Sequence, residues 1–348
     1  KEYLGQEVVP DSGCGSWLFE PQSTNLVPYS EDFSQSSWSK GSDISIESGY
    51  LAPDGNNTAY KVTKTGGGAP LLSSNQSLIT TTTRSIYART VSGTGKISLL
   101  SYFGNSNNLF DVTEQWQRFE INSANATGVA NFYAVDFRSL STTLSEVILW
   151  GANATNDQDY ATSYIPTEGS TVTRNQDVCT SGGSLASINS TEGVLYAEIA
   201  KNSLSNNNQI SISLSSGSTN NRVMFFTGAN SQQINCQVRS SGSTWYSSSF
   251  NLLAGSTNFN KIAIKYKEND FSFWVNGSKI NQATTGVTPL GLNELAFDVG
   301  SSANNFFGKT KALAVWKEAL SDEELADLTY PTPTDPTFAL DFDTIATD

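Results

Sequence analysis

Short runs of alternating apolar and polar residues recur along the whole chain, separated by clusters of Gly, Asn, Ser and Asp. A period of two indicates β-strands with one buried face, and the frequent turn clusters are typical of antiparallel β-sandwiches. The run Glu146–Gly151 is apolar on both faces through its middle, which predicts a central strand. Further strands are predicted at residues 59–63, 85–90, 96–103, 117–121 and 130–137.

Residues 261–280 carry the clearest hairpin pattern. Two alternating runs, 261–267 and 271–275, are joined by a turn, and the Asn276-Gly277 pair that follows is the strongest two-residue hairpin signal. The alternation places the other large residues of the second run in the core and Trp274 on the opposite face. There Trp274 would either offer a platform to a sugar ring or pack beneath a neighbouring loop.

One segment has a helical period. In residues 319–328, Ser321 is a good N-cap, Glu324 stands at the capping-box position, and Leu325 and Leu328 share a face. A short helix is therefore predicted near the C-terminus.

The composition adds a strongly polar surface to this picture. Of the 348 residues, 37% are hydrophobic and 15% are charged, against a usual charged fraction of about 25%. The surface must be rich in Ser, Thr, Asn, Gln and Gly, as in secreted, viral and carbohydrate-facing β-proteins. A formal net charge of −13 argues against nucleic acid as a partner. No apolar run approaches the roughly 18 residues of a membrane span, so no membrane insertion is expected.

Two residue types restrict the chemistry. Histidine is absent, which excludes Ser-His-Asp and Cys-His nucleophiles and imidazole zinc sites. The three cysteines, Cys14, Cys179 and Cys236, cannot all pair within one chain, and none has a CxxC spacing. A disulfide-built fold is thereby excluded, while a bridge between Cys14 and Cys179 and three buried thiols both stay open.

The length suits two domains of roughly 150 residues each. Residues 1–24 are predicted as a lead-in segment, 25–170 as a first module, 171–330 as a second module and 331–348 as an extended, proline-rich tail. The predicted fold class is all-β, with two tandem antiparallel β-sandwiches and one short C-terminal helix.

Two sets of strings bracket the first module. The opening set is Phe19–Phe33 with Trp38 and Ala52–Gly55, and the closing set is Trp150–Ala152, Tyr160–Thr167 and Ser170–Arg174. Together they resemble the ends of the jelly-roll, carbohydrate-binding-like modules of phage tail-fibre and virion proteins. The second module carries Gly193–Glu198, the Phe273–Gly277 hairpin and Phe307–Trp316. These strings resemble the concanavalin A-like or laminin-G-like sandwich.

The resemblances imply a virion-associated, fibre-like adhesion or decoration protein of a phage. Such a protein would bind host cell-surface polysaccharide, contact other virion proteins and form a homotrimer by analogy with fibres. Its expected location is the surface of the virus particle, or alternatively the extracellular medium. A purely structural virion appendage and a secreted bacterial polysaccharide-binding protein are the alternatives.

Sugar binding requires an exposed aromatic face ringed by amides and hydroxyls. Trp38, Trp245, Tyr246 and Trp274 lie in polar stretches and are the candidate glycan-binding residues. The Trp245-Tyr246 pair stands between two serine-rich runs and is the most suggestive of them.

Calcium is the one cofactor that the sequence suggests, because hard oxygen ligands suit the loops of β-sandwiches. The candidate ligands are Asp54, in the Ala52–Gly55 string, and Asp157 with Asp159, in the Asn156–Tyr160 string. Asp-Gly and Asn-Asp clusters form turns first, so a turn without metal is the favoured interpretation of each.

No catalysis is expected. Glycosidases need two carboxylates about 5 to 9 Å apart, and the compact E-x-D-x-x-E arrangement of the sandwich glycosidases is absent from the chain. A lyase that uses Tyr with Lys or Arg is not excluded, so a polysaccharide-degrading enzyme stays as an alternative.

Overall fold

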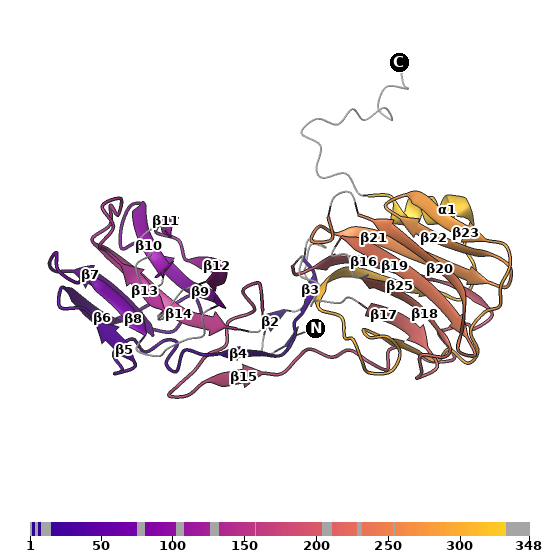
Figure 1. Ribbon diagram of the computed structural model, residues 1–348, viewed down its shortest axis with the longest axis horizontal. Helices are drawn as coiled ribbons and strands as arrows, with labels where there is room; N and C mark the ends of the chain where they lie inside the picture. Colours follow the sequence, from indigo (N-terminus) through magenta and orange to yellow (C-terminus); the bar gives the residue numbers. More distant parts are fainter. Residues whose placement is uncertain are drawn as a thin grey trace, which may run out of the picture. The chain divides into compact units, whose positions relative to one another are not determined.

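The computed structural model describes residues 2–3, 6–7, 15–74, 81–101, 108–125, 132–156, 158–203, 211–227, 232–252 and 255–331. The chain divides into two compact units. We call residues 20–177 the first sandwich, and residues 1–19 with 178–348 the second sandwich. Each unit is built from antiparallel sheets, which confirms the all-β prediction (Figure 1).

The first sandwich contains two five-stranded sheets, in the orders β11-β10-β13-β8-β5 and β12-β9-β14-β7-β6. β14 (Glu146–Thr155) lies between two neighbours in its sheet, so the predicted central strand is confirmed. Each of the other predicted runs overlaps a strand. The remaining bounds are β5 (Trp38–Lys40), β6 (Ile44–Tyr50), β7 (Ala59–Lys64), β8 (Leu71–Ser74), β9 (Thr81–Arg89), β10 (Gly95–Ser101), β11 (Leu109–Val112), β12 (Gln117–Asn125) and β13 (Tyr133–Asp136).

The core of the first sandwich lies between these sheets. Alternate residues of β14, Val147 and Leu149, pack into it against Leu99 and Val135 of the other sheet. Ile148, which lies between them, and Trp150, which follows Leu149, face the other side of the sheet and join a smaller buried cluster. The first sandwich is thus stabilised by apolar packing between its sheets, and the packed side chains follow the period of two that predicted the strands.

The two ends of the first sandwich are joined to each other. β4 (Ser23–Asn25) pairs with β15 (Val172–Arg174) in a separate two-stranded sheet. Just outside this pair, the buried Glu20 carboxylate forms an ion pair with Arg174 and accepts a hydrogen bond from the Ser163 backbone N–H at 2.8 Å. Strand pairing and a buried ion pair therefore close the base of this unit.

The second sandwich contains a six-stranded sheet, β23-β22-β21-β16-β25-β3, and a five-stranded sheet, β20-β19-β18-β17-β24. Its strand bounds are β3 (Trp17–Phe19), β16 (Glu192–Lys201), β17 (Ser211–Ser215), β18 (Arg222–Thr227), β19 (Gln233–Ser240), β20 (Ser243–Asn251), β21 (Asn260–Lys267), β22 (Phe271–Val275), β23 (Ser278–Ala283), β24 (Glu294–Ala296) and β25 (Gly308–Trp316). β21, β22 and β23 form the predicted hairpins, and Asn276 and Gly277 adopt the positive φ angles that such a turn requires.

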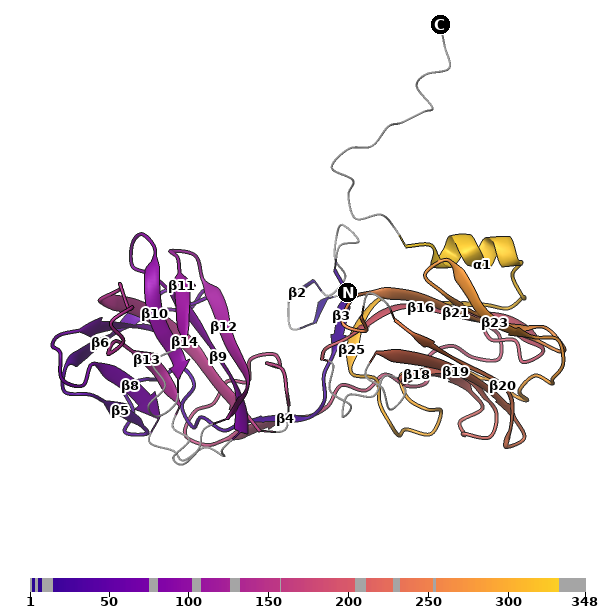
Figure 2. The same cartoon turned by 45° about the horizontal axis from the view of Figure 1, so that its top comes forward.

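The predicted helix is α1 (Asp322–Thr329), and its capping box between Ser321 and Glu324 is present. α1 lies on the outer face of the six-stranded sheet, away from the five-stranded sheet (Figure 2). Leu325 on α1 packs with Tyr196 and Trp274 beneath it. The second sandwich therefore has three layers, and the outer face of its five-stranded sheet is the one without a helix in the described part of the chain.

The N-terminal residues need a partial correction. Residues 1–24 were predicted as a lead-in segment, but β3 adds to β25 as the edge strand of the six-stranded sheet. Phe19 there stacks on Phe297, with ring centroids 4.6 Å apart. The pairing partners are about 290 residues apart in the chain, a separation at which no local sequence pattern reports pairing.

Some residues named in the sequence predictions lie outside the described part of the chain. Cys14 and the tail beyond Pro331 lie outside them, while Cys236 is a buried thiol and Cys179 a half-buried one. β1 (Glu2–Tyr3) and β2 (Gln6–Glu7) form a short hairpin.

Within the described part of the chain, no helix combines the length and apolarity that crossing a membrane would take.

The substitution Glu20→Ala should destabilise the first sandwich by about 2 to 3 kcal/mol, because it leaves the partly buried Arg174 guanidinium without its carboxylate. Urea unfolding of the purified chain measures this loss. Glu120→Ala is the control: it removes the more exposed carboxylate that pairs with Arg118 at 3.5 Å and should cost less than about 1 kcal/mol. Equal losses for both variants would contradict the assigned role of Glu20.

Candidate functional site

The outer face of the five-stranded sheet in the second sandwich is lined by polar side chains. Along β19, Ile234, Cys236 and Val238 point into the core. The intervening residues Asn235 and Gln237 therefore point outward, because side chains alternate along a strand. On the neighbouring strand β20, Tyr246 points inward and the serines on either side of Ser248 point outward.

A cavity of about 500 Å³ opens on this face. We call it the polar cleft. It is lined by Phe226, Asn235, Cys236, Gln237, Ser247, Ser248, Ser249 and Asn281. Amides, hydroxyls and one aromatic ring thus surround a space of the size that small-molecule ligands occupy.

Trp245 continues this row of side chains at the edge of the sheet. Val238 pairs with Tyr246 and Arg239 with Thr244, which leaves Trp245 as the extra residue of a β-bulge. Trp245 is next to the inward-pointing Tyr246, so the alternation of side chains turns its indole outward, and Trp245 is 46% exposed. An exposed tryptophan ring therefore stands two residues from Ser247 of the polar cleft.

Asn221 ties together the loops around Trp245. Its Oδ1 atom accepts hydrogen bonds from the backbone N–H of Ser241 at 3.0 Å and of Leu290 at 3.1 Å. Leu290 and the nearby Val287 are exposed apolar residues. Asn221 therefore links the β19–β20 turn, which precedes Trp245 in the chain, to the loop that carries Leu290.

Two arginines lie side by side at the same end of the row as Trp245, because Arg239 pairs with Thr244. Arg222 on β18 and Arg239 on β19 are directly opposite in register. Arg222 donates to Gln237 Oε1 at 2.8 Å and to the Val299 carbonyl at 2.7 Å, so it also contacts a residue of the polar cleft. Among the described residues, neither arginine forms an ion pair with a carboxylate.

The electrostatics of this pair are unusual for so acidic a chain. Partial burial lowers the pKa of Arg222, and the like charge of Arg239 lowers it further. Like charges directly opposite on adjacent strands are destabilising unless an anion compensates them. The arginine pair is thus a local cationic spot that a carboxylate or sulfate group would neutralise.

Comparisons with known proteins bear on this unit. Residues 174–326 match the family model of the concanavalin A-like lectin/glucanases superfamily. This match covers less than half of the chain, and it supports a concanavalin A-like sandwich fold for the second sandwich. With the jelly-roll arrangement of the first, the predicted fold class is confirmed. No curated protein matches the chain.

Solved structures similar to parts of the chain include carbohydrate-binding proteins. The carbohydrate-binding module CBM40 of the Ruminococcus gnavus IT-sialidase is 16% identical, with a TM-score of 0.34, over 40% of this chain and 84% of that one. Domain 4 of AbnA, an arabinanase from Geobacillus stearothermophilus solved with arabinotriose, is 15% identical, with a TM-score of 0.35, over 44% and 73%. A SAP-like pentraxin from Limulus polyphemus is 12% identical, with a TM-score of 0.30, over 43% and 80%. Likenesses of this size identify neither a ligand nor an activity.

Three of the four predicted sugar-binding aromatics are buried, which corrects the expectation that they form exposed platforms. Trp38 is 2% exposed and donates to the Tyr29 carbonyl at 2.8 Å. Tyr246 is 4% exposed and stacks on Phe271 inside the core. Trp274 is 5% exposed: the alternation placed it on the correct face, but α1 covers that face. Trp245 alone among the four is exposed.

The predicted calcium ligands do not come together in the described residues. Both carboxylate oxygens of Asp54 accept hydrogen bonds from Asn56 at 2.9 Å, as in an ordinary turn. Asp157 lies outside the described residues, and Asp159 is half-buried on the loop after β14. No group of three His, Cys, Asp or Glu side chains among the described residues could hold a metal ion. Calcium binding stays a prediction.

Sequence reasoning missed most of this face. Gln237, Arg222 and Arg239 were not proposed as site residues, although the alternation around Ile234–Val238 could have placed Gln237 outward. The pairing of Arg222 with Arg239 depends on hairpin register, for which the sequence carried no marker.

Two tryptophan substitutions separate the exposed platform from the core. Trp274→Ala should lower the free energy of unfolding by about 3 to 5 kcal/mol, because it opens a cavity between β22 and α1. Trp245→Ala should change it by less than about 1 kcal/mol, because the indole already faces solvent. Chemical denaturation of both variants measures the difference, and a large loss for Trp245→Ala would place that indole in the core instead.

Proposed function

We propose that the protein binds glycan chains on the outer face of the five-stranded sheet in the second sandwich. The observation that carries the proposal is an exposed indole, Trp245, beside a cleft lined by amides and hydroxyls. An indole face packs against the apolar C–H side of a pyranose, while amides and hydroxyls exchange hydrogen bonds with its hydroxyl groups. The match to a lectin and glucanase superfamily supports this proposal.

The arginine pair suggests which sugars bind best. A carboxylate-bearing sugar seated in the polar cleft would place a negative charge within reach of Arg222 or Arg239, next to Gln237. Guanidinium groups recognise carboxylates through paired hydrogen bonds. We therefore expect glycans with acidic units to bind this face more tightly than neutral ones.

Binding without cleavage is the reaction class that we propose. The residues that line the polar cleft include no Asp or Glu, and the chain has no His. Hydrolysis of a glycosidic bond by the usual mechanism needs two carboxylates flanking that bond. The cleft supplies recognition groups and lacks this catalytic pair.

We further propose that this binding serves adhesion by a phage particle. The support is the resemblance of the strings around residues 19–33 and 160–174 to virion modules, together with the low charged fraction. On this proposal the chain contacts host polysaccharide and other virion proteins and assembles as a homotrimer on the particle surface.

A glycan array followed by calorimetric titration tests the glycan site. Trp245→Ala should weaken binding about tenfold through loss of the stacking face. Trp17→Ala is a matched control, since Trp17 is 43% exposed on β3 at the other edge of the domain and should leave affinity unchanged. Arg239→Gln should remove the preference for a glucuronate oligomer over a glucose oligomer. Equal effects of the two tryptophan variants would overturn the assigned face, and oligosaccharide released during titration would overturn the non-catalytic proposal.

The particle role has its own measurements. Light scattering of the purified chain should give a mass three times 37.4 kDa if it is a trimer. Mass spectrometry should find the chain in purified virus particles. A monomer found only as free extracellular protein would favour a secreted polysaccharide-binding protein instead.

A further inference from the structure

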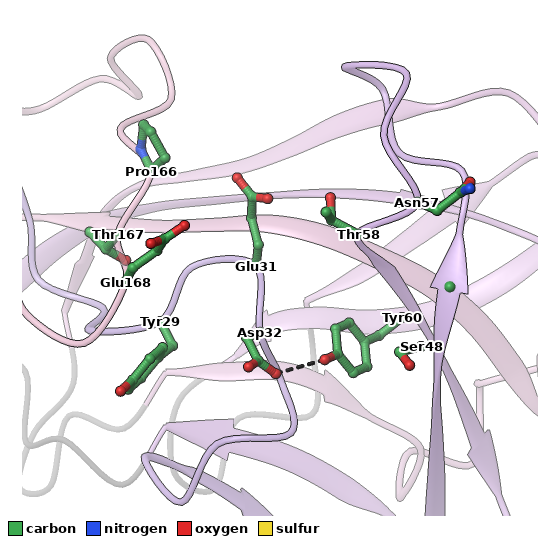
Figure 3. A pocket seen from close by; sticks show the side chains of 11 residues that line it. Tyr29, Glu31, Asp32, Ser48, Asn57, Thr58, Tyr60, Pro166, Thr167 and Glu168 are labelled. Carbon is green, nitrogen blue, oxygen red and sulfur yellow. Dashed lines mark hydrogen bonds between the residues drawn. The ribbon is translucent and has the colours of Figure 1, made fainter.

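The first sandwich holds a second cavity, of about 500 Å³, that plays no part in the glycan site described above (Figure 3). It is lined by Tyr29, Glu31, Asp32, Ser48, Gly49, Asn57, Thr58, Tyr60, Pro166, Thr167 and Glu168. We call it the tyrosine pocket. Two aromatic rings, several hydroxyls and three carboxylates meet there from three separate stretches of chain.

The wall that carries Tyr29 is held in place from both sides. Tyr29 and Glu168 form an antiparallel β-bridge, although they are far apart in the sequence. The Tyr29 ring packs against Gly169, where a Cβ atom would lie 3.2 Å from the tyrosine hydroxyl and where φ is +102°. The Tyr29 carbonyl accepts the hydrogen bond from the Trp38 indole. The pocket wall is therefore built before any ligand arrives.

On the opposite wall, the Asp32 carboxylate is occupied by hydrogen bonds within the protein. It accepts hydrogen bonds from the Tyr60 hydroxyl at 2.6 Å, from Gln35 at 2.7 Å and from the Ser34 backbone at 2.9 Å. Partial burial raises its pKa, but these hydrogen bonds outweigh burial and hold the pKa at about 2. Asp32 is therefore ionised at every physiological pH, and it positions the Tyr60 ring.

The other two carboxylates, Glu31 and Glu168, accept fewer hydrogen bonds from the described residues. Glu31 accepts one hydrogen bond, from Tyr164 at 2.9 Å, and Figure 3 shows its carboxylate between Glu168 and Thr58 in this view. Burial raises the pKa of Tyr164, so that hydroxyl stays protonated as a donor. The Glu168 carboxylate is exposed and forms no hydrogen bond or ion pair with another described residue. Both side chains keep acceptor capacity for a ligand.

Among the described residues, no Lys or Arg forms an ion pair with these carboxylates. The residues that line the pocket include no Lys or Arg, and none of its three carboxylates takes part in an ion pair among the described residues. Lys40 is close enough for its charge to interact with Asp32, but its ammonium group donates to the carbonyls of Ser34, Gln35 and Trp38. The described side chains also offer no cluster that could hold a metal ion. The pocket therefore carries a local negative charge that an organic cation would complement.

We infer that the tyrosine pocket binds an amine-bearing sugar, such as a 2-amino-2-deoxyhexose unit with a free ammonium group. The ammonium group would pair with Glu31 and Glu168 and lie near the faces of Tyr29 and Tyr60, which attract cations. The hydroxyls of the same sugar would donate to the remaining carboxylate oxygens. This site lies in the first sandwich and does not depend on the glycan site of the second.

Calorimetric titration of the full chain at pH 6 with three β-1,4-linked tetrasaccharides tests the inference. The glucosamine, N-acetylglucosamine and glucose tetramers share a ring and differ in one substituent. The glucosamine tetramer should bind at one site and about tenfold more tightly than either of the others. Its affinity should fall as the pH rises through the pKa of the sugar amine, because the neutral amine no longer pairs with the carboxylates. Equal affinities for all three sugars would overturn the inference.

Variants locate the site and control for the overall negative charge. Glu168→Gln should weaken glucosamine tetramer binding about fivefold. Glu114→Gln removes one exposed carboxylate outside the pocket and keeps an acceptor for the Gly93 N–H, so it should leave the affinity unchanged. Equal losses in both variants, or several weak sites per chain, would show diffuse attraction and overturn the inference. Trp245→Ala should leave amine binding intact, so a failed glycan site and a failed tyrosine pocket give different results.

Discussion

The register of the strands is the constraint on which the site depends. Along β19, Ile234, Cys236 and Val238 are buried in the core, and this packing places Asn235 and Gln237 on the outer face. A slip of one residue would exchange the two faces, burying amides and exposing apolar side chains. The free energy that fixes the core therefore also fixes the polar cleft. On β20 the same alternation turns the Trp245 indole toward solvent, because the neighbouring Tyr246 points into the core.

Local patterns predicted the elements well and their surroundings poorly. The capping box of α1 and the Asn276-Gly277 turn are contained in a few adjacent residues, so they could be predicted from the sequence. The alternation also placed Trp274 opposite the core. Its burial depends on Leu325 of α1, some 50 residues later in the chain, and no local pattern reports which element covers a face. The same limit explains Trp38 and the edge strand β3.

The candidate sites were harder to predict because they join distant segments. The tyrosine pocket needs Tyr29 beside Glu168, and the cationic spot needs Arg222 opposite Arg239. The sequence contained Tyr29, Glu31 and Asp32 within the Phe19–Phe33 string, but only the folded sheet shows that they face a cavity. Tryptophans drew attention in the sequence because they are large and few. A glutamine or glutamate such as Gln237 or Glu168 is common on protein surfaces, so it cannot be predicted as a site residue until its neighbours in the fold are known.

The net charge of −13 is a poor guide to either site. At physiological ionic strength, charges more than about 8 Å apart through solvent are largely screened. A ligand therefore responds to the groups within one or two side-chain lengths. The proposed attraction of an acidic sugar to Arg222 and Arg239 is therefore compatible with an acidic chain. Glu294, two strands away, accepts a hydrogen bond from Ser215 and pairs with neither arginine among the described residues. Conversely, the tyrosine pocket is selective for amines only if Glu31 and Glu168 act locally, since diffuse charge would attract any cation to any acidic surface.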